Sequence, residues 1–170
     1  GVIMVEKEAL REKEAEVKFN NYEETLKFHK DRKERVKAGA KLLKGKEIPW
    51  ETGRQGVLRF YHTEVMSGNT LDTIRLFVHE IRTHSGRHVH QGGFTLFVLR
   101  GKGYTVVDGV KHDWSEGDLI LLPFKKGGVE HQHYNTDNKP SRWLAFSSIP
   151  MGDMVGVFME QKENYQGYKV

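Results

Sequence analysis

Four histidines in two closely spaced pairs are the residues of this sequence best suited to chemistry. His88 and His90 flank a single valine, and His131 and His133 flank a single glutamine further along the chain. In a β-strand, a spacing of two residues places both side chains on one face. Neutral imidazole nitrogens are the commonest protein ligands for transition metals near neutral pH. Two such strands facing each other would bring three or four nitrogens to one point, so the sequence predicts a mononuclear metal site.

The strands that must position these histidines are predicted from a change of periodicity. From about residue 56 onward, short β-branched or aromatic runs alternate with a period of two, and glycine-bearing turns separate them. Asp108-Gly109 is a strong hairpin signal. The predicted strands cover residues 57–61, 73–81, 94–100, 104–107, 119–122 and 141–146. Many short strands favour an antiparallel sandwich or barrel, so the predicted fold class is all-β.

The first part of the chain is predicted to be helical. A helix over about residues 5–18 precedes a second one, which an asparagine pair could cap at its start and Gly45 could end. The stripe along the second helix is only partly apolar, which predicts packing on a partner along part of its length. We therefore predict a helical N-terminal arm over residues 1–50 and a β domain over residues 51–170.

The composition excludes several classes of protein. The chain has no cysteine, which excludes disulfides and thiolate metal sites. Its 27 lysines and arginines are interleaved with 23 acidic residues, and the net charge of +4 forms no basic block, so no nucleic-acid partner is predicted. No apolar run approaches the roughly 18–20 residues that cross a bilayer, and no signal-peptide pattern opens the chain. We expect a cytoplasmic protein that does not bind membranes.

The histidine pairs stand within segments that resemble the two motifs of the cupin family. These segments are residues 86–90 and 96–103 for the first motif, and residues 117–123 with His131 and Asn135 for the second. The resemblance covers about residues 75–150. It implies a double-stranded β-helix, or jelly roll, with the site inside its mouth. The usual cupin motif has a glutamate four residues after its second histidine, and Phe94 stands at that position here.

Without that glutamate, the metal ligands implied are His88, His90 and His131. This three-histidine set, followed by His133 and Asn135, is similar to the gentisate and salicylate type of ring-cleaving dioxygenase within the cupins. The resemblance implies an iron(II) centre that takes a hydroxy-carboxylate and dioxygen, with His133 as a catalytic residue; Mn, Ni, Cu or Zn are the other metals considered. Because three imidazoles leave a divalent ion its full charge, the site favours an anionic chelating substrate.

The sequence also departs from the pattern of those dioxygenases. Gly92 stands where they carry a glutamine, and Gln91 lies one residue early. Leu96 replaces an arginine that pairs with the substrate carboxylate, and Ala145 replaces an acidic residue. These departures argue against gentisate itself as the substrate.

Four residues are predicted to contact the substrate: Arg75, Gln91, Phe94 and Trp143. Arginine is a natural two-pronged clamp for a planar carboxylate, but strand parity leaves the direction of Arg75 open. The other histidines, namely His29, His62, His79, His84 and His112, are predicted to be structural.

The function predicted is cleavage of an aromatic ring or a C–C bond by an iron(II) dioxygenase. The small-molecule substrate would chelate the metal and would be anionic. Two alternatives stay open at this point: a non-oxidative metalloenzyme of the same fold, such as an isomerase, lyase or cyclase, and a module that binds a ligand without turnover. Single-domain cupins usually pair, so a homodimer or higher homo-oligomer is expected.

Overall fold

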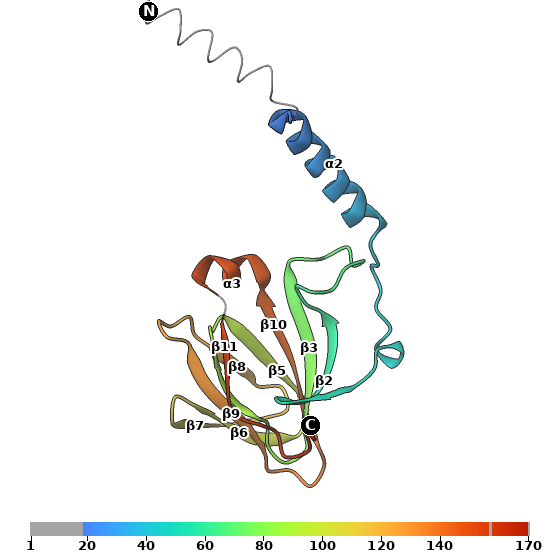
Figure 1. Ribbon diagram of the computed structural model, residues 1–170. Helices are drawn as coiled ribbons and strands as arrows, with labels where there is room; N and C mark the ends of the chain where they lie inside the picture. The colour runs from blue at the N-terminus through green and yellow to red at the C-terminus, as the bar shows by residue number, and fades with distance from the viewer. Residues whose placement is uncertain (1–18, 157, 170) are drawn as a thin grey trace, which may run out of the picture. The chain divides into compact units, whose positions relative to one another are not determined.

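The computed structural model describes residues 19–156 and 158–169, so the helix predicted over residues 5–18 lies outside the described residues (Figure 1). The chain divides into two units, residues 1–39 and residues 40–170. The boundary that the sequence places at residue 50 stays a prediction.

In the first unit, the helix α2 (Asn21–Ala38) begins as the sequence predicts but ends earlier. The side chain of Asn20 caps it by accepting from the backbone N–H of Glu23 at 3.2 Å. The prediction that Gly45 ends this helix is wrong. The backbone turns to an extended conformation at Gly39, and the N–H of Ala40 donates to the carbonyl of Gly68 at 2.8 Å. Because this N–H bonds outside the helix, it does not continue the hydrogen-bond pattern of α2. Gly45 instead begins the short 3-10 helix η1 (Gly45–Glu47).

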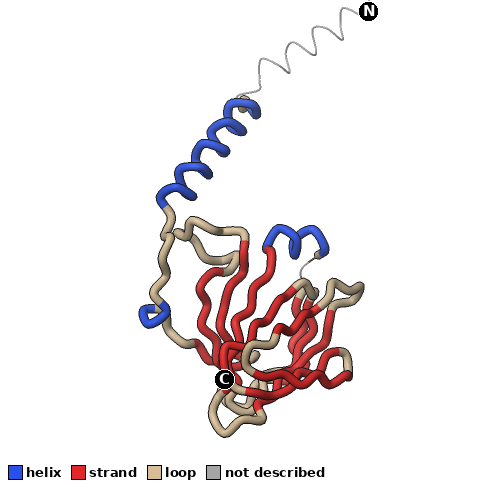
Figure 2. The backbone as a smooth tube through the Cα atoms, turned by 180° about the vertical axis from the view of Figure 1, so that it is seen from behind, coloured by secondary structure: helices blue, strands red, loops and turns tan. Residues whose placement is uncertain are grey.

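The second unit is a sandwich of two antiparallel sheets (Figures 1 and 2). One sheet has six strands in the order β1 (Glu51–Gly53), β2 (Gly56–His62), β3 (Ile74–Ile81), β10 (Ser141–Ser148), β5 (Phe94–Arg100) and β8 (Leu119–Leu122). The other has five, in the order β11 (Met159–Glu163), β4 (Arg87–His90), β9 (Val129–Asn135), β6 (Lys102–Val107) and β7 (Val110–Ser115). A short helix, α3 (Ile149–Val155), joins β10 to β11.

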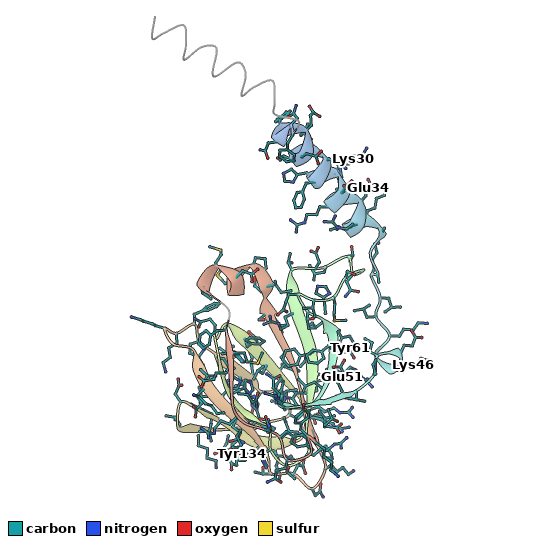
Figure 3. The ribbon with its side chains drawn as sticks, viewed as in Figure 1. Lys30, Glu34, Lys46, Glu51, Tyr61 and Tyr134 are labelled. Atoms are coloured by element: carbon teal, nitrogen blue, oxygen red, sulfur yellow. The ribbon has the colours of Figure 1, made fainter. Side chains whose placement is uncertain are left out.

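Every strand predicted from the sequence is present, which confirms the all-β fold with a helical N-terminal part. The predicted Asp108-Gly109 hairpin joins β6 to β7, and Asp108 adopts the left-handed backbone (φ 47°) that this turn needs. Inward side chains from both sheets make one core, whose most buried members include Ile81, Leu96, Val98 and Val129. Residues of opposite parity point outward: Tyr134, labelled in Figure 3, stacks on Tyr104 with ring centroids 4.6 Å apart.

The helix α3 and the strand β11 are not predicted from the sequence. β11 pairs with β4 and places Met159 opposite His90, so it closes the edge of the five-stranded sheet beside the histidines. Among the described residues, no helix combines the length and the apolar character that a membrane crossing requires.

Candidate metal centre

Three neighbouring strands of the five-stranded sheet bring the four histidines together. β4 pairs with β9 so that His88 lies opposite His131, and β9 pairs with β6 so that His133 lies opposite Thr105. Because the pairs have a spacing of two, all four rings turn to the inner face. His88, His131 and His133 are buried and His90 is partly buried.

His88, His90 and His131 form a compact cluster that could hold a metal ion. One ring nitrogen of each lies within 4.8 Å of the others, so small side-chain rotations would let all three reach one ion at about 2.1 Å. The ring centroids are 4.4 Å apart for His88 and His131, and 4.6 Å apart for His90 and His131. These are the three ligands that the sequence predicts.

The backbone fixes which nitrogen of each ring faces the cluster. Nδ1 of His88 lies 3.3 Å from the carbonyl oxygen of Gly86, and Nδ1 of His90 lies 2.6 Å from that of Gln91. Nδ1 of His131 lies 3.2 Å from the carbonyl oxygen of Val129. A carbonyl can only accept, so each Nδ1 carries the proton and each Nε2 keeps a free lone pair. Carbonyls that orient metal-binding imidazoles in this way are the usual outer partners of such ligands.

All three rings are held in the neutral form that a metal requires. Burial lowers the pKa of His88 to about 4, with His90 adding to the effect. Burial also lowers the pKa of His90, and it holds the pKa of His131 well below its usual range. Near neutral pH the cluster is therefore uncharged, and a cation entering it displaces no protons.

The metal-free protein is expected to lose stability as the pH falls below about 6.5. Unfolded histidines bind a proton near pH 6.5, whereas burial lowers the pKa of folded His88 to about 4 and that of His79 to about 3. Between these pKa values the unfolded chain binds more protons than the folded protein. The free energy of unfolding therefore falls by about 1.4 kcal/mol per pH unit for each additional proton that the unfolded chain binds. Urea midpoints measured with a chelator present at about pH 7.5 and about pH 5 test this; equal midpoints would contradict it.

His133 is buried beside the cluster and has a different environment. Its Nδ1 lies 2.8 Å from the hydroxyl of Thr105, and that hydroxyl accepts from the indole N–H of Trp114 at 3.0 Å. An indole nitrogen only donates, so the hydroxyl proton of Thr105 is left with Nδ1 of His133 as its acceptor. The proton of neutral His133 then sits on Nε2. His133 therefore has the opposite tautomer from the three cluster histidines.

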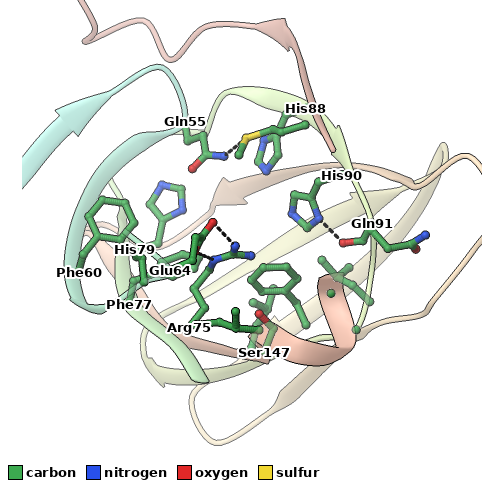
Figure 4. A pocket seen from close by; sticks show the side chains of 18 of the residues that line it. Gln55, Phe60, Glu64, Arg75, Phe77, His79, His88, His90, Gln91 and Ser147 are labelled. Carbon is green, nitrogen blue, oxygen red and sulfur yellow. Dashed lines mark hydrogen bonds and ion pairs between the residues drawn. The ribbon is translucent and has the colours of Figure 1, made fainter. Parts of the chain in front are cut away.

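A cavity of about 600 Å³ opens onto these histidines (Figure 4). The eight residues that the sequence predicts for the site all line it: His88, His90, His131, His133, Arg75, Gln91, Phe94 and Trp143. Arg75 shares the inward face of β3 with Phe77 and His79, which settles the direction that parity left open.

Gln91 and Phe94 shape the cavity in different ways. The side-chain oxygen of Gln91 accepts from the backbone N–H groups of Gly92 and Lys125 at 2.9 and 3.0 Å, so this side chain braces the loop before β5. Phe94 is buried, and its ring centroid lies 4.7 Å from that of His90. An apolar ring thus occupies the place next to His90 where the usual cupin motif has a carboxylate.

The cavity residues that were not predicted from the sequence include His79 and Glu64. His79 is buried, and its Nε2 has no hydrogen-bond partner among the described residues. Its ring fits against Gly56, where any Cβ would collide with Nε2. Because His79 shares its strand face with Arg75, parity could have placed it in the cavity. Glu64 comes from the irregular loop between β2 and β3, where no sequence period points to it.

The departures from the dioxygenase pattern have local physical reasons. A Cβ on Gly92 would collide with the backbone carbonyl of Pro123, so this position has no room for a glutamine. Leu96 and Ala145 lie directly opposite each other on β5 and β10, and both are buried. The two positions where the sequence departs from the dioxygenase pattern thus form one buried apolar pair.

Residues 76–147 match the model of the family described as "Cupin domain". That segment contains all four histidines and most of both sheets. These residues of the β domain are similar to a cupin domain. The resemblance seen in the sequence is therefore confirmed.

Relatives of this chain include two dioxygenases. The chain is 27% identical over 108 residues to a 5-aminosalicylate 1,2-dioxygenase of Comamonas sp, covering 62% of this chain and 28% of that enzyme. It is 38% identical over 65 residues to a gentisate 1,2-dioxygenase of Ralstonia sp, covering 38% of this chain and 18% of that enzyme. The chain thus spans less than a third of the length of either relative.

Among solved structures, the salicylate 1,2-dioxygenase of Pseudoaminobacter salicylatoxidans superposes with a TM-score of 0.54 at 18% identity. The match covers 80% of this chain and 36% of that one. At this identity the likeness establishes the cupin fold.

Proposed function

We propose that this protein is a mononuclear iron(II) dioxygenase that cleaves an aromatic ring or a C–C bond of a small chelating, anionic compound such as a hydroxy-carboxylate. The observation that carries the proposal is the cluster of three neutral imidazoles, in which one ring nitrogen of each lies within 4.8 Å of the others, with Phe94 packed against His90. The two dioxygenase relatives point to the same chemistry. Iron(II) bound there would supply adjacent open positions for a chelating substrate and dioxygen.

The protein's own groups around the cluster have distinct tasks in this proposal. The apolar wall of Phe94 and Leu96 excludes water from one side of the site and strengthens every electrostatic interaction inside it. The ring of Trp143 lines the cavity, and its indole N–H is buried with no hydrogen-bond partner among the described residues. His133 is a neutral ring with its proton on Nε2, and it would donate a hydrogen bond from Nε2 to oxygen on the substrate.

Metal analysis and oxygen uptake test the proposal together. Protein purified without added metal is expected to contain close to one iron per chain and to consume dioxygen with a hydroxy-carboxylate, a catechol or a β-diketone. A preparation that takes up no redox-active metal, or that shows no oxygen uptake with any of the three classes, would refute it. Turnover under strict anaerobiosis, or with zinc in the site, would instead favour an isomerase, lyase or cyclase.

The oligomeric state and the cellular location stay predictions. A homo-oligomer is consistent with the exposed apolar side chains of Phe97, Leu119 and Leu121 on the outer face of the six-stranded sheet. If the protein were instead a ligand-binding module, it would bind metal and ligand but form no product.

A further inference from the structure

The positive charge of Arg75 is already paired with a carboxylate of the protein inside the cavity. Its Nε donates to one carboxylate oxygen of Glu64 at 3.0 Å, and Nη2 contacts the other oxygen (Figure 4). This is the two-pronged geometry in which arginine binds a planar carboxylate. The Arg75 hydrogen bond is the main cause that lowers the pKa of Glu64, so the carboxylate is ionised near neutral pH. Glu64 therefore stands where a carboxylate of the substrate would otherwise bind.

The pair lies close to the three-histidine cluster. The guanidinium carbon of Arg75 is 5.6 Å from the ring centroid of Phe94, and Phe94 in turn packs against His90. A ligand that chelates a metal at the cluster would extend its remaining substituents into this part of the cavity.

Among the described residues, no other lysine or arginine lines the cavity to take the place of Arg75, which is paired with Glu64. Both Glu51 and Glu64, by contrast, line it. The apolar pair of Leu96 and Ala145 occupies the positions where the resembled dioxygenases carry charged groups. With neutral histidines, the protein side of the cavity has an excess of negative charge.

We propose that Glu64 is a specificity-determining residue that closes Arg75 to substrate carboxylates, so that the site selects chelators with no negative charge beyond their chelating atoms. The inference rests on the proposed function, because it takes the chelated end of the ligand to lie at the three histidines. A carboxylate brought to Arg75 would have to share it with Glu64 or displace it, and like charges side by side repel. The substrate class is then a catechol, an enol or a hydroxy-carboxylate that chelates through its own carboxylate, with an otherwise uncharged body.

A pair of ligands that differ only in charge tests this inference. The probes are 3,4-dihydroxybenzamide and 3,4-dihydroxybenzoate, which share the chelating catechol and differ at the substituent. Binding is measured by calorimetry to the zinc-loaded full chain, since zinc has no redox chemistry that could consume the catechol. The wild type is expected to bind the amide at least about tenfold more tightly than the acid.

The variant Glu64→Gln should remove this preference by freeing Arg75, so the ratio of the two dissociation constants should fall by about tenfold or more. Glu64 lies in a loop and its side chain is 46% exposed, so the substitution leaves the fold intact. Glu163→Gln is the matched control: Glu163 pairs with Arg87 outside the cavity with a side chain 49% exposed. That variant should keep the wild-type ratio.

Three outcomes would overturn the inference. The wild type could bind both probes equally, it could prefer the acid, or Glu64→Gln could leave the ratio unchanged. In each of these the probes still bind, so the proposed metal site survives. If neither probe bound the zinc-treated protein, the proposed function would fall along with the inference.

Discussion

The variant His90→Ala should bind no metal after dialysis and show no oxygen-dependent activity. His90 supplies one of three imidazoles, and its neighbours in the cavity, Phe94 and Leu96, offer no replacement donor. Losing even an outer partner of a metal ligand typically weakens binding by about 10–100-fold, so loss of a ligand should weaken it by more than about 100-fold. Metal content per chain and oxygen uptake, measured on the same sample, check both parts.

The matched control for this variant is His112→Ala. His112 is an exposed histidine of β7 and does not line the cavity. The control should keep the metal content and activity of the wild type. One metal ion per chain in His90→Ala would show that the ion is held elsewhere.

The histidine pairs could be placed from the sequence because a strand has a strict period of two. A spacing of two residues fixes that His88 and His90 share a face, and the same holds for His131 and His133. The pairing of β4 with β9 brings the two histidine pairs together, and these strands are separated in the sequence by β5, β6, β7 and β8. Here the cupin resemblance, rather than periodicity, supplied the missing long-range information.

The rest of the cavity depends on contacts that no local pattern encodes. Glu64 lies in a loop without periodicity, and its role depends on how that loop folds back over Arg75 on the next strand. The fit of His79 depends on Gly56 of the neighbouring strand. Gln91 is a similar case, since its side-chain oxygen is taken by two backbone N–H groups of the loops around it. Sequence spacing placed this glutamine at the site but could not show what it holds.

The tautomers also explain why two chemically identical residues, His131 and His133, receive different roles. The Nδ1 of His131 faces a backbone carbonyl, which leaves Nε2 free to bind a metal. The Nδ1 of His133 instead faces the Thr105 hydroxyl, which leaves a proton on Nε2. Two residues that alternate on one strand thus become a metal ligand and a hydrogen-bond donor, because the Nδ1 atoms of their rings have different partners.

The variant His133→Ala should therefore keep its metal and still lose about 10²–10³-fold in turnover, which is the usual cost of removing one positioned hydrogen-bond donor. The loss should appear in kcat, and metal content should stay near that of the wild type. A His133→Ala variant that retains full turnover, or that loses its metal as His90→Ala does, would refute the role of His133 as a hydrogen-bond donor to the substrate.

Thr105 provides the sharper version of the same test, because it changes the proton of His133 without removing the ring. Thr105→Val keeps the shape of the side chain and removes the hydroxyl that donates to Nδ1, whereas Thr105→Ser keeps that hydroxyl. Without the hydroxyl, the ring proton is no longer held on Nε2, so Thr105→Val should lower kcat and alter its pH profile while Thr105→Ser should not. Thr105→Val also leaves the indole N–H of Trp114 unpaired, at a cost of about 1–3 kcal/mol in stability. If the role of Thr105 were purely structural, Thr105→Val would lose stability but keep the pH profile of kcat. The pH profile, measured below the unfolding temperature of both variants, therefore separates a structural role from a role in placing the proton of His133.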